Sequence, residues 1–488
     1  MLYLRLTFFG LAILCLLQIA REIGGMLPGC VPEYYASEGK SSNLRPLNLD
    51  APLDVSQMDP IPKFETNPLF KREQDRIDAI DDASRCARYG VETLPDDQKH
   101  SRRIFFGAMV ADENPEVILA HSTEVYNKFS VVALVESNTT HSGRPREMNY
   151  GPGSRNARTL QESEMFGTAE NTKVVIDYWL EDMPDVVGMT REVEQRNTIW
   201  KIWVDQGMRE SDVGIMADLD EVVSRDFLNA VQVCDFPKLR YDPDNRPSCQ
   251  IPKIILSTMQ FEVSPLCIKD GEWFHPDIII GACLVGVGDP SGRVTPERDM
   301  KTIGHRTDEW GATDYKKYPQ DVIDNNRFPL WDGRDIREIN GSDEALLNFK
   351  DKDENGHGKT AVFGTAYHLH NWFKDMEVLR HKFATYGHFH DDAKTIPLSK
   401  IGEDIDIAVR CVRGIGNVEA TEEMQNPRPY YENNTLLPEG EEELFSLKGN
   451  RPIFFKDRTY VEQRHALVQE MVRADEAKYG TIYENEKR

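Results

Sequence analysis

The sequence is short of basic residues: 58 lysines and arginines stand against 82 aspartates and glutamates, a formal net charge of −24. Nucleic-acid-binding proteins need a basic surface, so this balance excludes nucleic acid as a partner. The eight cysteines include no Cys-x-x-Cys pair and no cysteine–histidine pattern typical of zinc sites. What remains is a globular composition, 40% hydrophobic, in 488 residues, which is long enough for one large or two ordinary domains.

The N-terminus carries an apolar run flanked by arginines, which we interpret as an uncleaved signal anchor at residues 6–21. Residues 1–5 are then a cytosolic tip, and the rest of the chain is luminal. A cleaved, secretory signal peptide is the alternative, but Gln18 stands two positions before Ala20 where a cleavage site needs a small residue. In either case we expect a secretory-pathway protein, attached to the membrane, if at all, by this one helix.

Residues 22–100 are rich in Pro, Ser, Asn and Asp and show no long strand pattern, so we predict a stem, with one helical piece over 74–89. The cysteines after the apolar run fit an oxidising compartment. Four of them lie between Cys234 and Cys283, and we expect that they can form two disulfides among themselves, with three possible connectivities.

From residue 101 to 414 apolar strands alternate with helices, which predicts right-handed crossovers and a mainly parallel open sheet flanked by helices. We expect strands at 103–111, 129–135, 174–176 and 215–217, a β region over 251–285 and a strand at 361–373. We expect helices after the caps Asn114 and Ser224, and over 191–208, 376–386 and 401–412. Residues 415–488 form a polar C-terminal extension with a terminal helix near 461–477.

The stretch Gly214–Val222 is the focus of the chain. It takes a buried strand directly into Asp218, Asp220 and Glu221. Carboxylates two positions apart at a strand end point the same way, and paired hard oxygen ligands suit Mn²⁺ or Mg²⁺, which also binds a diphosphate. Taken alone, Asp-x-Asp is equally an acidic surface turn.

Two other segments carry polar groups on otherwise apolar elements. In the helix 191–208, Asn197 lies within an apolar stripe and Arg196 at its edge, so that each must find a buried partner, either a ligand or a neighbouring loop. In the strand 361–373, His368 and His370 share one face, and a neutral imidazole can complete a metal site begun by carboxylates. Two ordinary surface histidines are the alternative.

Four blocks together resemble glycosyltransferase family 17, whose best-known members add the bisecting N-acetylglucosamine to N-glycans. They are the opening 103–126, the "VESN-T" segment at 131–143, Gln195-Arg196-Asn197 followed by Ala217–Glu221, and the strand Tyr367–Phe373. The blocks stand in the family's order. Two departures are Val222-Val223 for Ile-Pro and Ala366-Tyr367 for Gly-Trp.

The resemblance implies an A-type glycosyltransferase fold on a Golgi type II membrane anchor, with UDP-N-acetylglucosamine as donor, a divalent metal, and inversion at the anomeric carbon. The acceptor is a glycan, such as a mannose of a protein N-glycan. Asp220 is the expected metal ligand, Asp218 binds metal or ribose, and His368 is the late ligand, with His370 as second choice. The expected donor contacts are Glu136, Asn138, Arg196, Asn197 and Asp218.

Inversion by direct displacement needs a base to take the proton of the acceptor hydroxyl. The sequence offers Asp308, Glu309, Asp332 and Glu344 and does not choose among them. The alternatives to this function are another nucleotide-sugar donor and acceptor on the same fold, and a non-catalytic luminal glycan-binding protein.

Overall fold

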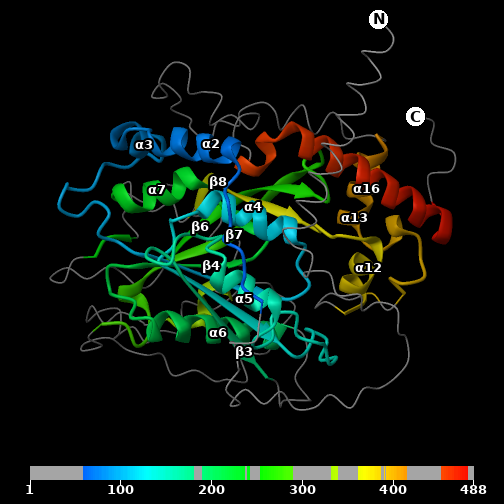
Figure 1. Cartoon of the computed structure of the whole chain (residues 1–488), viewed down its shortest axis with the longest axis horizontal. Coiled ribbons are helices and arrows are strands. Elements are labelled where there is room, and N and C mark those ends of the chain that lie inside the picture. Colours follow the sequence, from blue (N-terminus) through cyan, green and yellow to red (C-terminus); the bar gives the residue numbers. More distant parts are fainter. Residues whose placement is uncertain are drawn as a thin grey trace, which may run out of the picture.

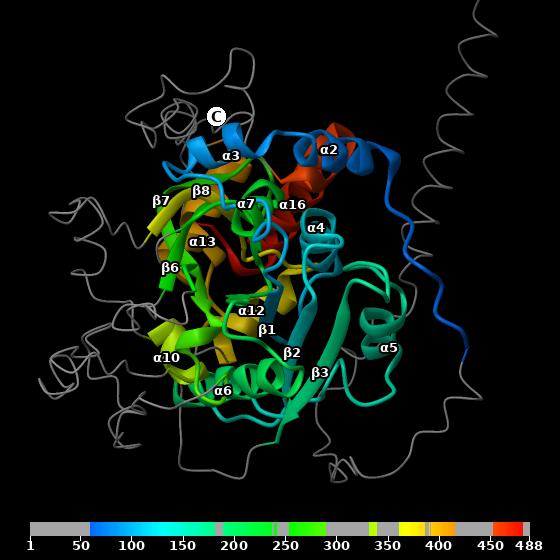
Figure 2. The same ribbon diagram turned by 90° about the vertical axis from the view of Figure 1, so that its left-hand side faces the viewer.

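The computed structural model describes residues 59–180, 189–236, 239–241, 253–288, 331–338, 361–385, 390, 392–414 and 452–481. Within these ranges an eight-stranded sheet is flanked by helices (Figures 1 and 2). The strands are β1 (Ile104–Val110), β2 (Val131–Ser137), β3 (Lys173–Trp179), β4 (Val213–Asp218), β5 (Glu221–Val223), β6 (Lys253–Glu262), β7 (Ile268–Ile280) and β8 (Ala361–His370). They lie in the order β3-β2-β1-β4-β7-β6-β8-β5.

Ten α-helices are described: α2 (Pro68–Asp78), α3 (Asp82–Arg88), α4 (Pro115–Val125), α5 (Arg155–Glu162), α6 (Met189–Asp205), α7 (Arg225–Val233), α10 (Gly333–Glu338), α12 (Met376–Thr385), α13 (Glu403–Arg413) and α16 (Arg458–Tyr479). The two predicted caps are confirmed. The side chain of Asn114 accepts the N–H of Glu116 at the start of α4, and that of Ser224 accepts the N–H of Phe227 at the start of α7.

The first half of the sheet, β3-β2-β1-β4, is entirely parallel, as predicted. Neighbouring residues of β1 face opposite sides. Phe106 stacks on Phe129 and contacts His121 of α4, whereas Gly107 faces α6. An added Cβ would lie 2.0 Å from Ile199 at Gly107 and 2.4 Å from Trp203 at Gly214. These two glycines therefore let α6 lie close against the sheet, with its N-terminal half beside the carboxyl ends of β1 and β4.

The second half of the sheet is mixed, so "mainly parallel" describes only part of it. The strand β7 runs antiparallel to β4 and β6, β5 runs antiparallel to β8, and β6 runs parallel to β8. The reason is local. The strands β6 and β7 are joined by the short connection 263–267, which allows only an antiparallel hairpin.

This second half also curls back on itself. Only two residues, Leu219 and Asp220, separate β4 from β5, yet β7, β6 and β8 lie between them in the sheet order. A flat sheet would place β4 and β5 about 19 Å apart, at roughly 4.8 Å per strand. The three peptide steps from Asp218 to Glu221 reach about 11 Å at most. The curl therefore brings β5 back to β4, and the acidic turn closes it.

The helices α2 and α3 lie within the segment assigned to the stem, and they pack on α7. Arg85 and Tyr89 both bind the Asp226 carboxylate, at 3.0 and 2.8 Å, and Cys86 forms a disulfide with Cys234. The helices are thus part of the packed body, while the limits of the stem and of the domain stay predictions. No helix in the described ranges has the length and apolar character needed to cross a bilayer; the predicted anchor at 6–21 lies outside those ranges.

The expected pairing of cysteines within 234–283 is wrong. Cys234 pairs with Cys86 and Cys267 pairs with Cys411, across separations of 148 and 144 residues. The sequence favours neighbours along the chain, whereas the fold brings distant segments together. Cys283 is also disulfide-bonded.

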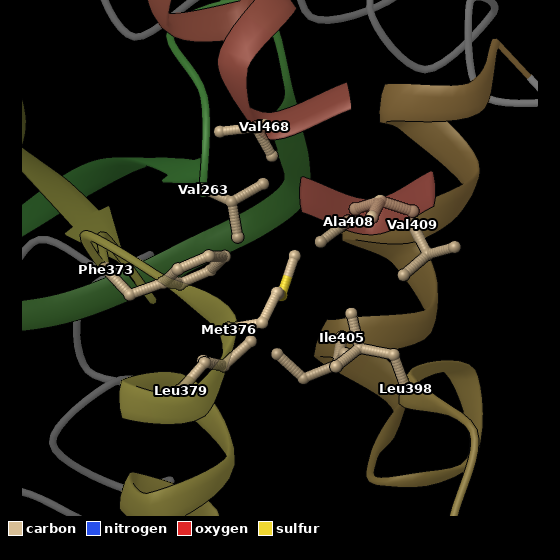
Figure 3. Close-up of a pocket in the computed structure, with 10 residues that line it drawn as sticks. Val263, Phe373, Met376, Leu379, Leu398, Ile405, Ala408, Val409 and Val468 are labelled. Carbon is tan, nitrogen blue, oxygen red and sulfur yellow. The ribbon is translucent and has the colours of Figure 1, made fainter. Parts of the chain in front are cut away.

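The C-terminal helices build a second apolar core on one side of the sheet (Figure 1). The helix α16, which confirms the predicted terminal helix, packs against α12 and α13. Figure 3 shows the small gap between these three helices, and its lining is wholly apolar, including Val263, Met376, Ile405 and Val468. We interpret it as an imperfection of core packing, because it holds no polar group that would orient a ligand.

Candidate functional site

The acidic turn between β4 and β5 is fixed at both ends by backbone hydrogen bonds. The Glu221 carboxylate accepts the N–H of Asp218 at 2.8 Å, and the Asp220 carbonyl accepts the N–H of Leu369 in β8 at 2.8 Å. At the same point Glu221 stands opposite His368 in the β5–β8 ladder. The turn is therefore held in one conformation, and His368, which is distant in sequence, lies beside it.

Asp218 is bound on both sides by guanidinium groups. Its Oδ1 accepts from Arg196 of α6 at 2.8 Å, and its Oδ2 accepts from Arg337 of α10 at 2.9 Å. Burial alone would raise the pKa of Asp218, but attraction to Arg337 and Arg196 outweighs it and holds that pKa well below the ordinary 3.8. Asp218 is thus ionised, with each oxygen engaged by a protein cation.

Glu221 is fully buried and satisfied by protein donors. Arg337 binds it through both terminal nitrogens, at 2.7 and 2.6 Å, and the indole N–H of Trp273 donates to it at 2.6 Å. Together with the N–H of Asp218, these donors use both carboxylate oxygens. Glu221 thus links the backbone of the turn to Arg337 and holds the turn in place.

Asp220 differs from both neighbours. Its side chain is 24% exposed, close to the 30% of Asp218, but among its described contacts the charged partner is the imidazole of His368, whose Nε2 lies 3.7 Å from Oδ2. That separation is too long for a hydrogen bond. Burial opposes ionisation of Asp220, yet attraction to His368 outweighs it and lowers the pKa of Asp220; in return the carboxylate raises the pKa of His368. The imidazole stacks on Trp273, with ring centroids 5.4 Å apart.

The other predicted donor contacts on β2 serve the fold of a neighbouring loop. The Glu136 carboxylate accepts from the backbone N–H groups of Asn149 and Tyr150 and from Arg146, and burial raises its pKa to about 8. The backbone carbonyl of Asn138 accepts from the N–H of Arg146. Both residues thus shape the loop 138–150 at the carboxyl end of β2, and their contact with a donor stays a prediction.

The family model of glycosyltransferase family 17 matches residues 57–241, which contain β1 to β5 and the acidic turn. Residues 57–241 are thus similar to glycosyltransferase family 17 over the segment that carries the acidic turn. The protein is therefore a glycosyltransferase, and the family implies a nucleotide-sugar donor and a glycan acceptor. No curated protein matches the chain.

Half of the site of this glycosyltransferase comes from beyond the matched segment. His368, Trp273 and Arg337 reach the acidic turn from β8, β7 and α10. Sequence reasoning found His368 through the alternation of β8 but missed the other two. Trp273 falls in a β region with no polar motif, and Arg337 falls in the stretch 286–340, which shows no periodic pattern. Neither Trp273 nor Arg337 belongs to a motif or periodic pattern that would mark it as a site residue.

The remaining predicted residues divide as follows. His370 lies near His368, with ring centroids 4.8 Å apart, and its Nδ1 contacts the buried carboxylate of Glu262 at 2.6 Å.

Asn197 is buried in α6, and its Oδ1 has no hydrogen-bond partner within the described part of the chain. Asp332, a candidate base, is buried at the start of α10. The other candidates, Asp308, Glu309 and Glu344, lie outside the described residues.

A divalent cation fits this site in part. Among the described residues no three His, Cys, Asp or Glu side chains gather into a complete ligand set. Asp220 and His368 nevertheless present an oxygen and a nitrogen donor to each other at 3.7 Å, and the carboxylate is partly exposed. These are donors that Mn²⁺ accepts, and in phosphate-handling sites substrate oxygens and water commonly supply the other ligands. Asp220 and His368 are thus the residues that would hold the cation.

Proposed function

We propose that this glycosyltransferase is a metal-dependent, inverting enzyme of the A-type fold that transfers N-acetylglucosamine from UDP-N-acetylglucosamine onto a glycan, a mannose of a protein N-glycan. The observation that carries the proposal is the acidic turn. The curl of the sheet holds it rigid, Asp220 is partly exposed within it, and His368 lies 3.7 Å away. The parallel half of the sheet, whose carboxyl edge bears this turn, supports the A-type assignment.

The residues divide the work. A cation held by Asp220 and His368 would neutralise charge on the leaving diphosphate as a Lewis acid. Asn197 of α6 offers a buried oxygen that has no hydrogen-bond partner among the described residues, which suits a donor hydroxyl. The loop held by Glu136 forms the neighbouring wall at the carboxyl end of β2.

The direct test is a donor screen with the purified full-length protein. Nucleotide sugars are offered with Mn²⁺, and both hydrolysis and transfer to an N-glycan are followed by release of the nucleoside diphosphate. We expect UDP-N-acetylglucosamine to be the best donor and chelation to abolish activity. Preference for another nucleotide sugar would leave the fold and metal site in place but change the donor.

We expect Asp220→Ala to lose on the order of 100-fold or more in kcat/KM, because a Lewis acid contributes several kcal/mol of transition-state stabilisation. Asp205→Ala is the matched control, since this aspartate is exposed at the end of α6. Full activity of Asp220→Ala, or full activity in chelator, would sink the metal assignment.

We propose that the enzyme is a Golgi protein anchored as a single-pass type II membrane protein by residues 6–21. The support is the apolar run with its flanking arginines and the disulfides of the folded part, which need an oxidising compartment. A C-terminal tag should be protected from protease in sealed microsomes, and a digested tag contradicts a luminal domain.

A further inference from the structure

The two aspartates of the acidic turn have different surroundings. Both oxygens of Asp218 accept from guanidinium groups, at 2.8 and 2.9 Å. Arg196 and Arg337, which supply them, are themselves buried, and each is also bound to a glutamate, Glu192 and Glu221 respectively. Asp220 has no such guanidinium partner among the described contacts. The side chain of Asp218 is itself 30% exposed, but a divalent cation placed against it would meet the two buried guanidinium groups, and like charges repel.

The position of Arg337 depends on a close backbone contact. Figure 2 shows α10 beside α6. At Gly333 an added Cβ would lie 2.2 Å from the carbonyl oxygen of Arg196 and 2.7 Å from Cα of Asn197. The absence of a side chain at this point lets α10 rest on the backbone of α6. One turn later along α10, Arg337 then reaches Asp218 and Glu221.

We propose that Arg337 is a positioning residue, and that Asp218 acts by holding Arg196 and Arg337 rather than by binding the donor or its cation. Asp218 joins α6 and α10 to the end of β4, Arg337 carries this restraint to Glu221, and Glu221 holds the backbone of the turn. Asp220 is then the carboxylate of the turn that faces the ligand. The inference rests on the proposed function for its ligand, whereas the anchoring of α10 by Asp218 does not depend on it.

The chain supplies a matched control at the opposite end of the same strand. Asp212, just before β4, is also held by two guanidinium groups, those of Arg103 at 2.6 Å and Arg209 at 2.8 Å. Its carboxylate is fully buried and lies at the amino end of the sheet, away from the acidic turn. Asp212→Asn thus removes the same kind of interaction without touching the site.

The experiment measures two quantities on the full-length protein. One is the Mn²⁺ concentration for half-saturation, read both from activity and from the rise in unfolding temperature on adding Mn²⁺. The other is the unfolding temperature of Asp218→Asn, Arg337→Gln and the double variant. Asp220→Asn should raise the half-saturating Mn²⁺ about 10-fold or more and remove the Mn²⁺-induced shift. Asp218→Asn should lower kcat and the unfolding temperature and leave half-saturation within about 3-fold of wild type.

Asp218→Asn and Arg337→Gln should also be non-additive, because both remove the ion pair between Asp218 and Arg337. The double variant should therefore lower the unfolding temperature by less than the sum of the two single shifts. Asp212→Asn should lower the unfolding temperature without changing kcat or the Mn²⁺ response. Its shift in unfolding temperature should add to that of Arg337→Gln. Arg337→Lys, which keeps the charge but not the two-pronged geometry, should retain the Mn²⁺ response and lose kcat.

Three results would overturn the inference. One is a shift in half-saturating Mn²⁺ for Asp218→Asn equal to that for Asp220→Asn. Another is additivity of Asp218→Asn and Arg337→Gln. The third is a wild-type kcat for Arg337→Lys. This variant also tests whether Arg337 positions the turn if the Asp218 variant does not fold. If the wild type neither responds to Mn²⁺ nor uses any donor, the proposed function fails, and the unfolding temperatures still decide whether Asp218 anchors Arg337.

Discussion

Replacing Gly333 by alanine tests how the acidic turn is held from a distance, without changing a charged group. The new Cβ would begin 2.2 Å from the carbonyl oxygen of Arg196, and the atoms it meets belong to the backbone of α6. Restoring an ordinary contact moves α10 by about 1 Å. The bonds from Arg337 to Asp218 and Glu221, now 2.6 to 2.9 Å long, would then exceed the hydrogen-bond limit.

We expect Gly333→Ala to cost about 1–3 kcal/mol, the usual range for overpacking in a closely packed site. It should also lower kcat in proportion to the loss of Arg337. Urea unfolding and donor hydrolysis measure the two effects. Gly402→Ala is the control, because an added Cβ there meets nothing within 4 Å; as the N-cap of α13 it should cost at most about 1 kcal/mol and leave kcat unchanged. Unchanged stability and activity in Gly333→Ala would refute the seating of α10 on α6.

Two further predictions concern stability. Cys86→Ser together with Cys234→Ser should cost about 2–5 kcal/mol, because that disulfide closes a separation of 148 residues; an unfolding midpoint equal to that of the wild type would contradict this. Burial raises the pKa of Glu124 to about 7 from 4.5, so the folded state favours its protonated form. The contribution of Glu124 to the free energy of unfolding should therefore be greatest below about pH 4.5 and fall by up to about 3 kcal/mol as the pH rises to about 7. Glu124→Gln should reduce that slope, and identical pH profiles for the two proteins would exclude this role.

The sequence predicted what local patterns encode. Asn114 and Ser224 mark helix starts because their side chains cap adjacent N–H groups, and β1, β2 and β4 are apolar runs typical of buried strands. The acidic turn was placed correctly because its charges begin where the apolar run stops.

Contacts between distant segments had no such signature. Arg337 lies in a stretch without periodicity, and its partner Asp218 is more than one hundred positions away. The disulfide partners were also misjudged, since chain proximity is a poor guide where the fold brings α3 to α7 and the end of β6 to α13. The curl of the sheet was unforeseen for the same reason: nothing in residues 218–221 reveals that their next pairing partner is β8.

That curl has a consequence for how the protein is made. The ribosome delivers Glu221 long before it delivers His368, its partner in the ladder. Until β8 has emerged, β5 has no partner strand, and the backbone around Asp220 lacks its bond to Leu369. Closing so distant a contact is intrinsically slow. The acidic turn would therefore form late, and a growing chain would be inactive until most of its length has been made.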